Sequence, residues 1–184
     1  MNKTITNNPL TQTNWYVITG GPSSGKTTTV NILKERGYIT TMEHARHFLD
    51  TQRLKGKTIE EVRKNQKGFQ LAVLEAQIKQ EKEIEPNLLV FLDRAIPDAL
   101  AYYRFLKLKP DPKLTVALKT VSYKKIFIMD CLPLKNDYAR IENAAAQKEI
   151  HALITEVYES LSFEVVHVPT IAAEYRVDFI LENL

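Results

Sequence analysis

Residues 15–28 read WYVITGGPSSGKTT, and this stretch decides the fold. Its first five residues are all aromatic or β-branched, which predicts a short strand. Residues 20–27 match the pattern G-x-x-x-x-G-K-[ST] in full. A helix is predicted from about Gly25 to Arg36, and Gly37 stands where a glycine commonly ends a helix. A phosphate-binding loop between a strand and a helix is therefore predicted.

Each residue type in this loop has a chemical reason. Glycines let the backbone curl, so that successive N–H groups face an anion, and the helix N-terminus adds partial positive charge. Lys26 can bridge the β- and γ-phosphates, and the hydroxyl of Thr27 can bind Mg²⁺. The sequence therefore predicts a site for ATP, or another NTP, with Mg²⁺. The residues expected to bind it are Gly20, Gly21, Pro22, Ser23, Ser24, Gly25, Lys26, Thr27 and Thr28.

The rest of the chain alternates short apolar runs with helical stretches. Further strands are predicted at residues 38–42, 88–92, 125–129 and 163–168. Helices are predicted at about 43–50, 58–85, 97–108, 113–121, 140–161 and 171–184, with 58–85 as one long periodic stretch. The run 88–92 is apolar without alternation, as in a strand that is covered on both faces. Such alternation predicts an α/β fold with a parallel sheet between two layers of helices.

The length and composition of the chain exclude several classes of protein. The chain has 184 residues, which suits a single domain from residue 15 to 184 after a polar, flexible N-terminal arm of residues 1–14. The single cysteine, Cys131, excludes a disulfide framework and a cysteine-based zinc finger. No stretch approaches the roughly 18 apolar residues of a membrane span. The net charge of +3 is too small to indicate nucleic-acid binding, and we expect a cytoplasmic protein.

Asp93 directly follows the apolar run 88–92 and is the candidate for the Mg²⁺ shell. In an open parallel sheet, ligands gather at the carboxyl ends of strands, where Asp93, Glu43 and the phosphate loop are expected to meet. Asp130 also ends an apolar strand and is the alternative. Arg94 and Asp98 follow Asp93 closely, and this favours Asp93.

Three segments resemble the small AAA-domain, kinase-like P-loop proteins. They are the loop 20–28, residues 91–98 (FLDRAIPD), and the later pattern Asp137-x-x-Arg140-x-Glu142. By this resemblance, the closest functional relatives are nucleoside and nucleotide kinases, including thymidylate, deoxynucleoside and ribosylnicotinamide kinases. The resemblance covers residues 15–184. It implies a three-layer α/β/α P-loop NTPase fold with strand order 2-3-1-4-5 and a helical lid.

The resemblance also implies roles for single residues. Glu43 matches the acid that deprotonates the acceptor hydroxyl in deoxynucleoside kinases, unless it only caps the following helix. Arg94 matches the arginine that steadies the substrate or the transferring phosphate, and its alternative is a surface ion pair. Arg140 matches a lid arginine that closes over the phosphates, and its alternative is a charge on a solvated helix face. Ala95 departs from the glycine that is usual after Asp-Arg.

These features predict a Mg²⁺-dependent kinase that transfers the γ-phosphoryl group to a small nucleoside-like or other metabolite hydroxyl. The alternatives are an NTPase without an acceptor and a nucleotide-binding regulatory protein. Glu43 and Arg140 favour the kinase, because a protein that only binds nucleotide needs neither of them. His44 and His47 are three residues apart but lack a third ligand, so a metal site there is not expected.

Overall fold

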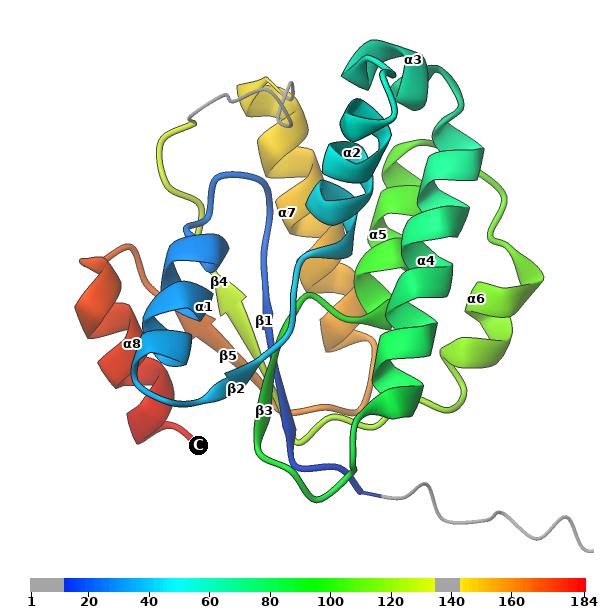
Figure 1. The fold of residues 1–184 in the computed structure, drawn as a ribbon. Coiled ribbons are helices and arrows are strands. Elements are labelled where there is room, and N and C mark those ends of the chain that lie inside the picture. The colour runs from blue at the N-terminus through cyan, green and yellow to red at the C-terminus, as the bar shows by residue number, and fades with distance from the viewer. Residues whose placement is uncertain (1–11, 135–142) are drawn as a thin grey trace, which may run out of the picture.

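The structure, a computed structural model, describes residues 12–134 and 143–184. Its five strands are β1 (Trp15–Thr19), β2 (Ile39–Thr40), β3 (Val90–Asp93), β4 (Lys125–Met129) and β5 (Val165–Val168). They form one sheet in the order β2-β3-β1-β4-β5, and every neighbouring pair is parallel (Figure 1). The predicted parallel sheet and its strand order are therefore confirmed.

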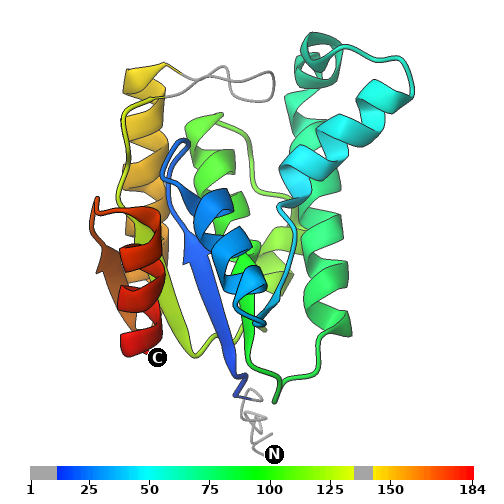
Figure 2. The ribbon, with the colours of Figure 1, turned by 60° about the vertical axis from the view of Figure 1, so that its left-hand side comes forward.

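Helices cover both faces of the sheet (Figures 1 and 2). On one face lie α1 (Lys26–Glu35) and α8 (Ala173–Glu182), and on the other lie α4 (Gln66–Glu83), α5 (Ile96–Phe105), α6 (Pro112–Ala117) and α7 (Ala144–Glu159). The short helices α2 (His44–Leu54) and α3 (Ile59–Lys64) follow β2 and lie against the upper end of α4 in Figure 1. The three-layer α/β/α architecture is thus confirmed.

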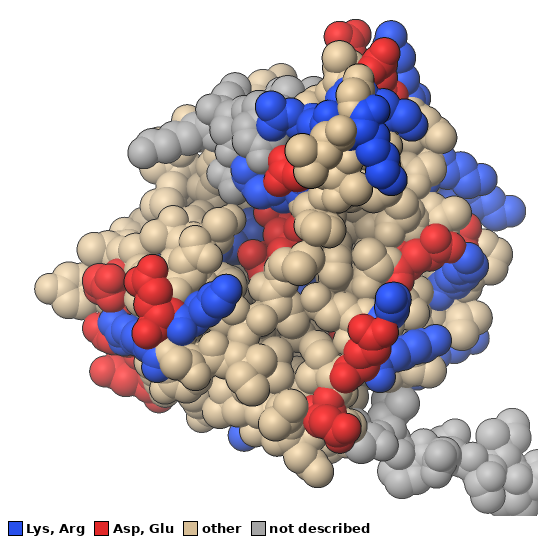
Figure 3. Space-filling model, viewed as in Figure 1, with Lys and Arg blue, Asp and Glu red and all other residues tan. Residues whose placement is uncertain are grey.

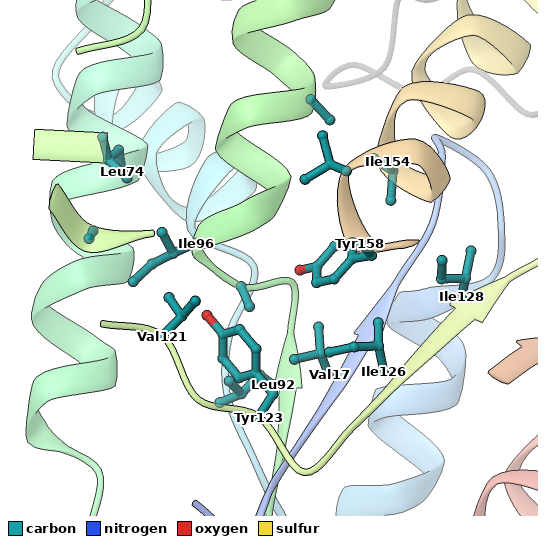
Figure 4. Close-up of a cluster of buried hydrophobic side chains, with 14 of the residues drawn as sticks. Val17, Leu74, Leu92, Ile96, Val121, Tyr123, Ile126, Ile128, Ile154 and Tyr158 are labelled. Atoms are coloured by element: carbon teal, nitrogen blue, oxygen red, sulfur yellow. The ribbon is translucent and has the colours of Figure 1, made fainter. Parts of the chain in front are cut away.

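Each face of the sheet has its own hydrophobic core, because side chains alternate along the strands. On one face Val17, Leu92 and Ile126 pack against α4, α5 and α7 (Figure 4). On the other face Tyr16 and Phe127 pack against α1 and α8. Both β1 and β3 are buried along their whole length, and for β3 the apolar run 88–92 predicts this burial. Truncating a core leucine or isoleucine to alanine typically costs about 2–5 kcal/mol of stability.

The single helix predicted over residues 58–85 is wrong, because α3 and α4 are separate helices that meet at Asn65. Thr58 and Glu61 form a capping box at the start of α3, with Glu61 N donating to Thr58 Oγ1 at 3.2 Å. The backbone at Asn65 leaves helical geometry, with φ −101° and ψ 67°. The side chain of Asn65 then accepts a hydrogen bond from Gly68 N at 3.0 Å and begins α4. Apolar periodicity continues across such a break, so it did not reveal the break.

The last long helix, α7, begins at Ala144, and Asn143 caps it by accepting a hydrogen bond from Ala146 N at 2.9 Å. The prediction had begun this helix near residue 140. Arg140, Asp137 and Glu142, and with them the predicted lid, lie outside the described residues, as do residues 1–11 of the predicted arm. In the described ranges, every helix is too short or too polar to span a bilayer.

Candidate active site

The phosphate loop connects the carboxyl end of β1 to the start of α1. Gly20 has φ 137°, and a Cβ there would lie 2.6 Å from the carbonyl oxygen of Met129, so no side chain fits. Ser23 and Gly25 also have positive φ, at 53° and 82°. Left-handed residues at these two positions curve the backbone tightly, which is the geometry of an anion-binding loop.

The side chain of Lys26 lies against the phosphate loop. Its Nζ donates hydrogen bonds to the carbonyl oxygens of Gly20 at 2.9 Å and Gly21 at 2.8 Å, and to Ser24 Oγ at 3.0 Å. Only 5% of the residue is exposed. Burial, together with the charge of Arg94, lowers the pKa of Lys26 well below its usual value. A bound polyphosphate would oppose this shift, because an anion stabilises the ammonium form.

Asp93 ends β3 and lies beside Ile18 of β1, next to the phosphate loop. Its backbone N–H donates to Thr41 Oγ1 at 2.9 Å, while its Oδ1 is buried and has no hydrogen-bond partner among residues 12–134 and 143–184. Burial and the charge of Glu43 raise the pKa of Asp93. An unpaired buried carboxylate oxygen is costly unless a cation satisfies it.

This carboxylate fits Mg²⁺. Proteins usually hold Mg²⁺ through one or two side-chain oxygens, with waters and substrate phosphates as the other ligands. The half-buried Thr27, which follows Lys26, supplies a hydroxyl at the start of α1. Asp93 and Thr27 together provide this type of donor set. Among the described residues, His44 and His47 belong to no metal-binding group of three or more His, Cys, Asp or Glu side chains.

Arg94 is held in a strained but fully bonded position. It has φ 67° although it is not glycine, which costs about 1–2 kcal/mol. Its Nη1 donates to Asp98 Oδ1 at 2.7 Å, its Nε to Glu43 Oε1 at 3.2 Å, and its Nη2 to Tyr102 OH at 3.3 Å. The side chain is 11% exposed, so the alternative of a surface ion pair does not describe it.

Asp98 fixes this arrangement. Its Oδ1 accepts from Thr19 Oγ1 as well as from Arg94, both at 2.7 Å. Its Oδ2 accepts from Tyr158 OH at 2.6 Å and from Ala95 N at 3.2 Å. The sequence marked Asp98 only as a neighbour of Asp93. Its separation of only four residues from Arg94 was a usable signal, although Arg94 precedes α5 and the two residues do not share a helix.

Glu43 occupies the N-cap position of α2, but its side chain makes no capping hydrogen bond. Instead it accepts from Arg94, and Arg46 Nε lies 3.8 Å from its other oxygen. Burial alone would raise the pKa of Glu43, but the charges of Arg94 and Lys26 outweigh burial and lower it. Glu43 is therefore ionised at neutral pH, as a proton acceptor must be.

A cavity of about 190 Å³ adjoins these charged groups. Lys26, Glu43 and Arg94 line one part of it, and the remaining walls come mainly from α2, α4 and α5. The apolar walls include Leu49, Phe69, Val73, Leu74, Tyr102 and Phe105. Lys and Arg side chains gather over α2 and α3 (Figure 3), where residues 44–64 hold six of them against three Asp or Glu.

Two glutamines of α4 also line the cavity, and sequence reasoning missed both. Gln77 Nε2 donates to Glu81 Oε1 at 2.9 Å and to the carbonyl oxygen of Arg94 at 3.4 Å. Gln70 is 8% exposed, and its amide makes no hydrogen bond within the described residues. An amide that borders the cavity in this way is available to a ligand.

Asp130, the alternative to Asp93, follows β4 in a different environment. Its backbone N–H donates to Val168 O at 3.0 Å, and its carbonyl accepts from Arg176 Nη2 at 3.4 Å. The charge of Asp93 acts on the pKa of Lys26, and Asp130 is not among the main contributors to that pKa. Cys131 lies against Gly21 of the loop, and burial raises the pKa of its thiol.

The chain matches a known protein family and is similar in fold to solved structures. A family model described as an AAA domain matches residues 15–176. Deoxyadenosine kinase from M. mycoides, solved with dCMP and dCDP, is 14% identical with a TM-score of 0.65, and the match covers 92% of this chain and 97% of that one. NadR, solved with NR, is 17% identical with a TM-score of 0.65. This match covers 91% of this chain and 48% of NadR.

No curated protein sequence matches the chain significantly. The structural matches are below 25% identity and concern the fold, which is that of the P-loop kinases. The family match spans most of the chain and includes the phosphate loop, Asp93 and Arg94. The chain therefore belongs to the AAA domain family of kinase-like P-loop proteins.

Proposed function

We propose that this protein is a Mg²⁺-dependent kinase that transfers the γ-phosphoryl group of ATP, or another NTP, to a hydroxyl of a small nucleoside-like acceptor. One observation carries the proposal. Lys26, Glu43 and Arg94 line the same cavity, whose remaining walls are largely apolar. A phosphate site, a carboxylate and a largely apolar cavity are therefore adjacent, which is the geometry that phosphoryl transfer requires.

In this mechanism the loop N–H groups and Lys26 hold the β- and γ-phosphates. Thr27 and Asp93 would hold Mg²⁺, which neutralises phosphate charge when it is bound. Glu43 accepts the proton of the acceptor hydroxyl while the oxygen forms its bond to the γ-phosphorus. The bond between this phosphorus and the β–γ bridging oxygen breaks, and ADP leaves. Arg94 stabilises the negative charge that develops on the transferring group.

The cavity favours an acceptor with a flat, partly polar ring. Phe69 and Tyr102 provide aromatic walls, and the free amide of Gln70 offers one donor and one acceptor to a ring edge. The solved neighbours are consistent with this class, since one is a deoxyadenosine kinase and another was solved with NR. We therefore propose a nucleoside-like acceptor.

The test is to incubate the protein with ATP, Mg²⁺ and a panel of nucleosides, and to identify phosphorylated products by mass spectrometry. Glu43→Gln removes the proton acceptor and should reduce acceptor-dependent transfer roughly a hundredfold, the scale of one acid–base group. ATP binding and slow acceptor-free hydrolysis should change much less. Glu60→Gln, on the exposed surface of α3, is the matched control.

The outcomes separate this proposal from the alternative of an NTPase without an acceptor. An equal loss of transfer and hydrolysis in Glu43→Gln would mean that Glu43 serves the metal or the attacking water. No phosphorylated product from any acceptor, with ATP still hydrolysed, would favour the NTPase. A loss confined to acceptor-dependent transfer would support the kinase.

A further inference from the structure

Three consecutive carbonyl oxygens of the phosphate loop, those of residues 22–24, accept hydrogen bonds from outside the loop. The first accepts from Gln147 Nε2 at 2.9 Å and the second from Leu132 N at 3.0 Å. The third accepts from Arg176 Nη1 at 2.6 Å. These donors belong to α7, to the segment after β4, and to α8. Three distant parts of the chain therefore hold one side of the loop.

This arrangement determines where the loop N–H groups point. In a trans peptide, the carbonyl of one residue and the N–H of the next point in opposite directions, and the described chain has no cis peptide bond. Holding carbonyls 22–24 from outside therefore turns the N–H groups of residues 23–25 away from those donors. The positive φ values of Ser23 and Gly25 agree with this curvature, which is that of an anion-binding nest.

The burial of the two side-chain donors shows that they are not incidental surface contacts. Gln147 is 5% exposed, and its Nε2 also donates to the carbonyl oxygen of Leu132 at 3.0 Å. Arg176 is 1% exposed and its Nη groups donate to carbonyl oxygens, while its buried Nε has no hydrogen-bond partner in the described part of the chain. A Cβ on Gly25 would lie 3.0 Å from Arg176 Nη1, so the guanidinium lies directly against the loop.

Within the described residues, Arg176 donates hydrogen bonds to carbonyl oxygens; burial lowers its pKa, and the charge of Asp130 opposes this shift. Burying a charged side chain here costs free energy. An apolar side chain of similar volume would cost less, because it requires no desolvation of a charge. The cost is offset if Arg176 orients a peptide group that must bind an anion. Gln147 also donates a hydrogen bond to a loop carbonyl, but it carries no net charge. Its role therefore cannot be to attract the anion through charge, and orienting the peptide group remains.

We propose that Gln147 and Arg176 are positioning residues that preset the N–H groups of the phosphate loop for the polyphosphate of the NTP. This proposal rests on the proposed nucleotide binding, and it requires neither an acceptor nor turnover. It therefore remains testable if the kinase assignment fails.

The experiment measures binding of inorganic tripolyphosphate with Mg²⁺ by isothermal titration calorimetry, and thermal unfolding of the unliganded protein by circular dichroism. Gln147→Met removes the donor and nearly keeps the side-chain length, whereas Arg176→Met removes the donors and also shortens the side chain. We expect each to weaken tripolyphosphate binding roughly tenfold to a hundredfold, the range for misplacing one hydrogen bond to a charged group. Arg176→Lys keeps one charged donor and should recover part of the affinity lost in Arg176→Met.

Two controls change side chains that lie on α7 or contact α8. Lys148→Met changes an exposed neighbour of Gln147 on α7. Arg36→Met removes the ion pairs of Arg36 with Glu174 at 2.8 Å and Asp178 at 2.6 Å, which join α1 to α8 away from the loop. Both controls should bind tripolyphosphate within about twofold of the wild type, even where Arg36→Met lowers the melting temperature.

Unchanged affinity in Gln147→Met and Arg176→Met would overturn the proposal, as would an equal loss of affinity in the two controls. A wild-type protein that binds no tripolyphosphate would also overturn it. If Arg176→Met does not fold, the tripolyphosphate affinities of Gln147→Met and Arg176→Lys test the proposal in its place. A wild type that phosphorylates no acceptor, combined with weakened tripolyphosphate binding in Gln147→Met, would contradict the kinase while supporting the positioning role.

Discussion

Glu81→Gln should stabilise the protein at and above neutral pH. Glu81 lies on α4 and is 7% exposed. Its Oε1 accepts from Gln77 Nε2 at 2.9 Å and Ile96 N at 3.1 Å, and its Oε2 accepts from Tyr123 OH at 2.8 Å. Burial raises the pKa of Glu81 from 4.5 to about 7, and the nearby charge of Asp98 acts in the same direction.

The sign and size of the effect follow from this pKa. The folded state holds the proton of Glu81 more tightly than the unfolded state does, so stability falls as pH rises from 4.5 to about 7. A difference of roughly 2.5 pKa units corresponds to about 3 kcal/mol, all of it lost above pH 7. An amide stays neutral at every pH and avoids this loss. Its oxygen can keep the two N–H donors, and its NH₂ can donate to Tyr123 OH.

Thermal unfolding followed by circular dichroism between pH 5 and pH 8 measures this difference. At pH 8 the melting temperature of Glu81→Gln should exceed that of the wild type by roughly 6–12 °C, and the gap should shrink toward pH 5. Asp93, whose pKa is also raised, is present in both proteins, so its contribution cancels in the comparison. Glu83→Gln, on the exposed side of α4, is the control and should show no such trend. A gap that does not grow with pH would refute the argument.

Three further predictions concern the phosphate site and the cavity. Lys26→Ala should reduce nucleotide turnover at least a hundredfold, measured by ADP release, while the circular dichroism spectrum stays that of a folded protein; unchanged turnover would contradict the assignment of the loop. Asp93→Asn should lower turnover and raise the Mg²⁺ concentration for half-maximal activity, whereas Asp130→Asn should do neither; the reverse result would exchange their roles. Gln70→Met should lower kcat/KM for the acceptor about tenfold with little change in the KM for ATP, and an equal change in both constants would argue against a contact with the acceptor.

The fold could be predicted because its signals are local. The loop pattern predicts a strand on one side and a helix on the other. The apolar run at residues 88–92 indicates a strand that is buried on both faces, and residues 125–129 indicate another strand. The break at Asn65 was not predicted, because it depends on one side chain, which accepts a hydrogen bond from Gly68 N. The apolar spacing continues unchanged across the break. Helix ends depend on such single contacts, and periodicity does not record them.

The site was predicted only in part, for a related reason. Lys26, Asp93 and Arg94 lie in or beside recognisable motifs, so their type and position were informative. Tyr158 lies 60 residues from Asp98, and Arg176 lies 152 residues from Ser24, yet each donates a hydrogen bond to that partner. A contact between residues so far apart leaves no spacing pattern in one sequence. Such pairs can be identified only from the folded structure, in which the sheet brings the ends of its strands together.

Three departures from local preference lie where these distant partners converge. Arg94 adopts a left-handed backbone, Ser23 does the same inside the loop, and Asp93 has a buried oxygen that no other described residue hydrogen-bonds. Each feature costs on the order of 1–3 kcal/mol, and natural sequences retain such costs mainly at functional sites. All three lie at the carboxyl edge of the sheet, beside the phosphate loop. The cost of Asp93 falls if a cation satisfies its oxygen, and the strain at Ser23 is offset if the loop binds an anion. The same features that weaken the unliganded protein would thus stabilise its complex with Mg²⁺ and a nucleotide.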